Sequence, residues 1–148
     1  MNDQIFISYS HKDNEWLERF QVMLKPLTKN QSFILWDDTL IKPGIKWKED
    51  IEKNLANSTL ALLLVSKDFL ASDFVTDHEL PVLLNAAEKK GLVIFWVPIG
   101  PSMYKATEIA NYQAVHDPTK PLNTLDSKIL DQEIVAICNK ISEMGRRN

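Results

Sequence analysis

The sequence predicts an open, doubly wound α/β fold with a central parallel sheet of about five strands in flavodoxin-like order. Three observations favour this class. Short apolar segments alternate with longer segments whose apolar residues recur at helical spacing. Two of the short segments, residues 59–66 and 92–100, are apolar on both faces, as are central strands covered by helices on each side. The 148 residues contain no internal repeat or low-complexity linker, which indicates a single domain.

The first half of the chain is expected to contain two strands and two helices. Asp13 is in position to cap the first helix, and Pro26 is expected to help end it. The adjacent Pro43 and Gly44 are a strong turn signal and indicate a loop before the second helix. The expected elements are a buried strand at 4–10, a helix from 13 to about 26, a strand at 32–38, a loop at 39–46 and a helix at 47–56.

The second half continues the alternation, and its first helix carries Glu79. Thr76 or Asp77 is expected to cap this helix, with Pro81 in its first turn. Glu79 sits at one edge of the apolar stripe, and no Lys or Arg lies three or four residues away to pair with it. The expected elements are a strand at 59–66, the Glu79 helix up to about 90, a strand at 92–100, a loop-rich stretch at 100–123 with a short edge strand at 112–115, and a helix at 126–144.

Composition and charge disfavour several classes of function. The net charge is -3 and the 17 basic residues are scattered, so direct nucleic-acid binding is not expected. The longest apolar runs are far shorter than the roughly 20 residues of a membrane span, and the N-terminus lacks a secretion-signal pattern. We therefore expect a cytoplasmic protein without a membrane partner. Cys138 lies in the apolar stripe of the last helix and is expected to be a core residue.

The sequence lacks the patterns of familiar cofactor and metal sites. The four glycines form neither G-x-G-x-x-G nor a phosphate-binding loop. The three histidines and Cys138 lack metal-ligand spacing. Asp37 and Asp38 could form a magnesium-dependent phosphoacceptor site, but the pair ends the second strand rather than the first, which disfavours that alternative. We therefore expect neither a metal nor a bound cofactor.

Ligands of doubly wound sheets bind beyond the carboxyl ends of the strands, where the winding direction changes. In the expected strand order, this point lies between the first and third strands. The residues placed around the resulting crevice are Ser8, Tyr9, Ser10, Trp36, Asp37, Asp38, Ser66 and the segment 72–79.

Four linked motifs resemble those of a known family. They are "IFISYSHKD" at 5–13, "ILWDD" at 34–38 before the Pro-Gly loop, "LLLVSKDFLASDF" at 62–74 followed by "ELP", and "FWVPI" at 95–99. In order and spacing they resemble the box motifs of Toll/interleukin-1 receptor (TIR) domains of the bacterial type. The resemblance covers nearly the whole chain and implies a flavodoxin-like fold.

The resemblance implies two alternative functions. One is homotypic assembly, as a non-enzymatic signalling module, through the loop after the second strand. The other is cleavage of NAD+, as substrate, at the nicotinamide-ribose bond, with ADP-ribose or a cyclic form of it as product. The glutamate that cleaves NAD+ in the family maps onto Glu79; many catalytic members carry Trp four residues earlier, where this chain has Val75 preceded by Phe74. Bacterial domains of this kind resemble effectors of anti-phage defence.

The chemistry of the residues favours the enzymatic alternative independently. The nicotinamide of NAD+ is cationic and departs neutral, so the reaction needs stabilisation of positive charge on the ribose rather than a general acid. An ionised carboxylate supplies this and accepts hydrogen bonds from the ribose hydroxyls. Without the resemblance, Glu79 would be interpreted as a first-turn residue that complements the helix dipole. A nucleoside deoxyribosyltransferase-like glycosidase is a second enzymatic alternative. It shares the fold and the use of a carboxylate but would not explain the Pro-Gly loop.

Further residues are expected to bind the dinucleotide, and most have a structural alternative. Tyr9 and Trp36 would contact it or serve as core aromatics at strand ends. Lys46 would reach a phosphate, and Trp47 would stack on adenine or anchor the second helix. The expected substrate-binding set is Ser8, Tyr9, Ser10, Trp36, Asp37, Lys46, Trp47 and Phe74, while Asp37 and Asp38 have the alternative of forming the turn after their strand.

The loop at 39–46 is expected to form a contact between copies of the domain. Leu40 and Ile41 are apolar residues in a stretch that turn chemistry places at the surface. The resemblance implies that this loop, with Pro43 and Gly44, packs head-to-tail against the next protomer and completes the dinucleotide site. The alternative is a loop that folds back onto its own domain. The 148 residues are accounted for by one domain and leave no room for a sensor. We therefore also expect a sensor domain that is fused to this one or associated with it.

Overall fold

The structure is a computed structural model that describes residues 3–30, 33–37 and 46–146. Five parallel strands form one sheet in the order β2-β1-β3-β4-β5, so the winding direction changes between β1 and β3. This arrangement confirms the predicted fold class. The elements are β1 (Asp3–Ser8), α1 (Asn14–Lys29), β2 (Phe33–Asp37), α2 (Trp47–Ala56), β3 (Ser58–Val65), α3 (Lys67–Ala71), α4 (Leu80–Lys90), β4 (Val93–Pro98), β5 (Gln113–Ala114) and α5 (Ser127–Arg146).

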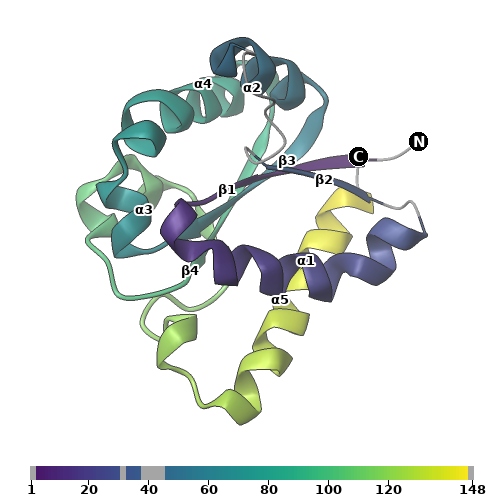
Figure 1. The fold of residues 1–148 in the computed structure, drawn as a ribbon, viewed down its shortest axis with the longest axis vertical. Coiled ribbons are helices and arrows are strands. Elements are labelled where there is room, and N and C mark those ends of the chain that lie inside the picture. Colours follow the sequence, from purple (N-terminus) through teal and green to yellow (C-terminus); the bar gives the residue numbers. More distant parts are fainter. Residues whose placement is uncertain (1–2, 31–32, 38–45, 147–148) are drawn as a thin grey trace.

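Helices cover both faces of the sheet (Figure 1). α1 and α5 pack on one face, which we call the α1–α5 layer, and α2, α3 and α4 pack on the other, the α2–α4 layer. Successive side chains of a strand point to opposite faces. Ile5 and Ile7 of β1 therefore join the core of the α1–α5 layer, whereas Phe6 joins the core of the α2–α4 layer. β3 is buried from Leu60 to its end, as expected of a central strand.

The end of α1 differs from the prediction. The helix continues to Lys29, and Pro26 lies inside it. A proline lacks the N–H that would donate to the carbonyl four residues earlier, here that of Val22. Val22 is 74% exposed, so this carbonyl lies on the solvent side of α1, where water can bind it. The proline is tolerated there, and the prediction that it helps end the helix was wrong.

The helix that carries Glu79 begins earlier than predicted. Helical residues run from 73 to 90, with α4 as their second part. Ser72 caps the segment, because its carbonyl accepts a hydrogen bond from the Thr76 N–H at 2.9 Å. Thr76 and Asp77 lie inside the helix, so neither is the cap that the sequence predicted. Glu79 consequently lies in the second turn, where the helix dipole has less effect than in the first.

A π-helical turn, Val75–Glu79, interrupts this helix. Its hydrogen bond runs from the Leu80 N–H to the Val75 carbonyl, five residues back instead of four. Pro81 follows Leu80 and has no N–H to donate, and in a regular α-helix its ring would collide with the Asp77 carbonyl. The wider turn accommodates this proline.

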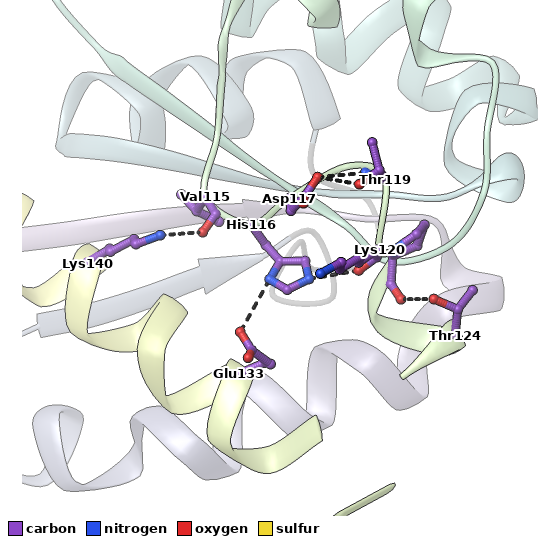
Figure 2. Close-up of polar contacts among 9 residues, drawn as sticks. Val115, His116, Asp117, Thr119, Lys120, Thr124, Glu133 and Lys140 are labelled. Carbon is purple, nitrogen blue, oxygen red and sulfur yellow. Dashed lines mark hydrogen bonds and ion pairs between the residues drawn. The ribbon is translucent and has the colours of Figure 1, made fainter. Parts of the chain in front are cut away.

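α5 is joined to the edge of the sheet by the loop after β5 (Figure 2). β5 is the short edge strand that the sequence predicted. The His116 ring lies between two acceptors: Nε2 is 2.7 Å from the Lys120 carbonyl, and Nδ1 is 3.6 Å from the Glu133 carboxylate of α5. Lys140, two turns further along α5, donates to the Val115 carbonyl at 3.1 Å.

Cys138 is a core residue, as predicted. Its side chain is buried in the α1–α5 layer, and burial raises the pKa of its thiol to about 12. Among the described residues, no helix has the length and apolar character that crossing a membrane requires.

Candidate active site

A cleft of about 340 Å³ opens where β1 and β3 end. One wall is the turn after β1, and the other is α3 with the start of the Glu79 helix. This is the change in winding direction at which the sequence predicted a ligand site. The lining residues are Tyr9, Ser10, His11, Lys12, Asp68, Ala71, Ser72, Phe74 and Val75.

A buried hydrogen bond joins the two walls. The Ser66 hydroxyl, at the end of β3, donates to the Asp13 carboxylate, and both side chains are buried. Asp13 is the N-cap residue of α1, as predicted, but its side chain makes no capping hydrogen bond to the helix. Burial raises the pKa of Asp13, and the hydrogen bond from Ser66 partly offsets that rise.

Glu79 is buried in the α2–α4 layer, with 1% of its surface exposed. It ends the π-helical turn, and its neighbours Val75 and Leu80 are buried as well. The sequence placed it at the edge of the apolar stripe, whereas the structure places it inside. The cleft wall includes Val75, one turn earlier, but not Glu79. A ligand in the cleft would therefore reach the carboxylate only after the residues between them move.

Three aromatic side chains meet between the start of α2 and the π-helical turn. Trp47 contacts Phe74 edge to face, with 5.4 Å between ring centroids, and its ring lies 4.9 Å from that of His78. The Phe74 and His78 rings are 6.0 Å apart. Trp47 and Phe74 were both predicted to bind substrate, and the structure brings them together. His78 was not singled out from the sequence; its place directly before Glu79 was the available signal.

The family model described as "TIR domain" matches residues 5–124, which is most of the chain. The chain belongs to the TIR domain family. It is 22% identical over 143 residues to "Uncharacterized protein y4lF" of Sinorhizobium fredii (strain NBRC 101917 / NGR234). The matched residues make up 97% of this chain but 44% of that protein. This TIR domain thus spans less than half the length of that relative.

Solved TIR domains share the fold. A chain from "Structure of the activated Roq1 resistosome directly recognizing the pathogen effector XopQ (TIR domains)" matches with a TM-score of 0.54 and 15% identity. The match covers 99% of this TIR domain and 86% of that chain. At this identity the likeness concerns the fold alone.

Two other predicted site residues of this TIR domain lie away from the cleft. Trp36 is 7% exposed and stacks on Phe6, with 4.8 Å between ring centroids, so the core alternative holds for it. Asp37 is the buried last residue of β2, and it accepts a hydrogen bond from the Gln21 side-chain amide at 3.4 Å. Neither residue lines the cleft.

The remaining predicted residues occupy varied positions. Ser8 is fully buried and shares a face of β1 with Phe6, on the side of Glu79. Lys46 is exposed, with its ammonium 3.9 Å from the Glu49 carboxylate. Within the described ranges, no three His, Cys, Asp or Glu side chains gather in a way that could hold a metal ion. Asp38, Leu40, Ile41, Pro43 and Gly44 lie outside the residues that the structure describes.

Proposed function

We propose that this TIR domain cleaves NAD+ at the nicotinamide-ribose bond, with Glu79 as the catalytic carboxylate. The observation that carries the proposal is the burial of Glu79 in the helix whose first turn forms a cleft wall. Glutamate is almost never fully buried, and buried ionisable side chains beside a cleft are common at functional sites. π-Helical turns, such as the one that holds Glu79, also occur frequently at functional sites.

The reaction needs one negative group and one water molecule. The bond between C1′ of the ribose and N1 of nicotinamide breaks, and its electron pair goes to N1, which becomes neutral. Positive charge develops on the ribose ring, where the Glu79 carboxylate stabilises it. Water adds to C1′ and loses a proton to solvent, which gives ADP-ribose; attack by the adenine of the same molecule gives a cyclic product instead.

The cleft and the aromatic residues supply binding surface for this substrate. A volume of about 340 Å³ is at the lower end of ligand pockets, so the cleft would hold part of a dinucleotide. Phe74 lines one wall and offers a ring for stacking, whereas Tyr9 lines the other wall but is 2% exposed and packs in the core of the α1–α5 layer. Trp47 packs against Phe74, so a shift of α2 would change the aromatic surface at the cleft.

We further propose that self-association produces the open, active site. Glu79 is buried here, and the domain resembles TIR domains from an activated resistosome. Specific activity should then rise with enzyme concentration, and Ile41→Asp or Gly44→Arg should abolish the rise while the monomer stays folded. Specific activity that is flat across concentrations and unaffected by Ile41→Asp would show that each monomer carries a complete site.

Nicotinamide release from NAD+ by Glu79→Gln tests the catalytic assignment. The variant keeps the size of the side chain and removes its charge, so turnover should fall by about 100-fold or more. Asp77→Asn is the matched control, because Asp77 lies on the same π-helical turn but is exposed. Asp77→Asn should retain activity. Unchanged nicotinamide release by Glu79→Gln, with the fold intact, would end the proposal.

A non-enzymatic interaction module is the second candidate. The absence of Glu79 from the cleft wall favours it, because a module of this kind needs no access to the carboxylate. Self-association without nicotinamide release at any concentration would establish it. We also propose a role in bacterial anti-phage defence, which a phage challenge of cells that express the wild type or Glu79→Gln would test.

A further inference from the structure

The turn after β1 is held together by its own hydrogen bonds. The Asp13 N–H donates to the Ser10 carbonyl at 2.7 Å. The Ser10 hydroxyl in turn accepts from the Lys12 N–H at 3.3 Å. Tyr9 and Ser10, which line the cleft, therefore keep a fixed position relative to Asp13.

The opposite wall is built outward from Ser66. The Ser66 hydroxyl caps α3 by accepting from the Phe69 N–H at 3.0 Å. α3 is only 5 residues long, and directly after it the Ser72 hydroxyl accepts from the Val75 N–H at 3.3 Å. Ser72 thereby starts the helix that carries Glu79. A displacement of Ser66 would therefore move α3 and the start of the next helix, and with them Glu79.

The hydrogen bond from Ser66 to Asp13 connects these two walls. Asp13 is 8% exposed and Ser66 5%, so water competes little for the bond. The Ser66 hydroxyl donates to one wall and accepts from the other, so its geometry depends on both.

We propose that Asp13 and Ser66 are positioning residues that set the separation between the Tyr9–Ser10 wall and the Glu79 helix. They would thereby align a dinucleotide held by the first wall with the carboxylate of the second. The inference rests on the proposed cleavage of NAD+. Asp13 is the cleaner residue to change, because its side chain does not cap α1 and its loss removes no helix cap.

Three variants separate positioning from stability. Asp13→Ala removes the link, and Asp13→Asn keeps an oxygen acceptor for Ser66. Asp13→Glu keeps the charge and lengthens the side chain by one methylene, which should displace one wall from the other. Thr107→Ala is the matched control, because it deletes a hydroxyl that accepts from the Ile109 N–H at 3.2 Å in a turn that does not line the cleft.

The variants are compared in kcat and KM for nicotinamide release and in hydrogen exchange of residues 9–13 and 66–72. Asp13→Ala and Asp13→Glu should lower kcat/KM by about tenfold or more, because small misplacements of reacting groups are costly. Asp13→Ala should also speed exchange in both walls. Asp13→Asn should restore both values to near wild type, and Thr107→Ala should change neither.

Two results would overturn the inference. One is unchanged exchange in both walls of Asp13→Ala. The other is an activity loss that follows only the unfolded fraction, with full activity in folded Asp13→Glu. If the wild type releases no nicotinamide, the proposed function fails, while the exchange data still decide whether Asp13 and Ser66 hold the walls together. If Asp13→Ala does not fold, Asp13→Glu and Asp13→Asn supply the comparison.

Discussion

Pro81 offers a test of why the helix widens at Glu79. We attribute the π-helical turn to this proline, which cannot donate to the Asp77 carbonyl and would collide with it in a regular helix. Pro81→Ala removes both constraints. Pro81 is exposed, so the substitution leaves no cavity and changes only the backbone preference at this position.

The expected gain in stability is modest. Proline is about 3 kcal/mol less favourable than alanine inside a helix. The wider turn has already relieved the collision, so Pro81→Ala should recover about the value of one backbone hydrogen bond, about 1 kcal/mol. For a domain of this size, such a gain raises Tm by about 2–4 °C. Activity should move in the opposite direction, because each residue turns a helix by about 100° and closing the turn would rotate Glu79 away from its buried position.

Thermal unfolding and nicotinamide release measure the two effects. Pro26→Ala is the matched control, since Pro26 is also an exposed proline inside a helix, but in the other layer and without a π-helical turn. It should raise Tm and leave nicotinamide release unchanged. The reasoning fails if Pro81→Ala leaves both Tm and nicotinamide release at wild-type values, because packing rather than the proline would then hold the turn open.

Three further outcomes are expected. Burial raises the pKa of the Cys138 thiol to about 12, so alkylation near pH 8 should proceed only as fast as the protein unfolds; rapid labelling of folded protein would contradict this. The pKa of Asp13 is raised above its unfolded value of 3.8, so its contribution to stability is largest below that value and is lost as pH rises through the folded pKa. The stability of Asp13→Asn minus that of the wild type, measured by urea unfolding, should therefore be larger at about pH 7 than at about pH 4. An equal difference in stability at the two pH values would refute this. His116→Ala loses its contacts with Lys120 and Glu133, so it should cost about 1 kcal/mol and speed amide exchange in the loop but not in β3, whereas uniformly faster exchange would indicate global destabilisation.

The fold was predictable because its signals are local and repeated. The run from Leu60 to Val65 is apolar at every position, and this indicated a central strand whatever its neighbours were. Cys138 followed from the helical spacing of its stripe. Signals of this kind depend on the spacing of apolar residues within a segment and not on the distant residues that the segment contacts in the fold.

The candidate site was harder to predict because tertiary partners override local rules. Asp13 before a helix is a regular capping pattern, yet its carboxylate bonds to Ser66, 53 residues away. Ser72 and Thr76 are both acceptable caps by composition, and in the structure the Ser72 hydroxyl makes the capping bond by accepting from the Val75 N–H. The register of β1 on β2 places Trp36 beside Phe6, which the sequence of either strand alone does not reveal.

The two-residue length of β5 has a consequence for a domain proposed to work at high local concentration. A long, flat, exposed edge strand invites other chains to add strands to the sheet, which leads to irreversible aggregation. β5 offers almost no ladder for such addition, and the chain leaves the sheet directly afterwards into a loop held to α5 by His116 and Lys140. Copies of the domain can therefore crowd together at this edge without merging their sheets, so that contacts made through helices and loops stay reversible.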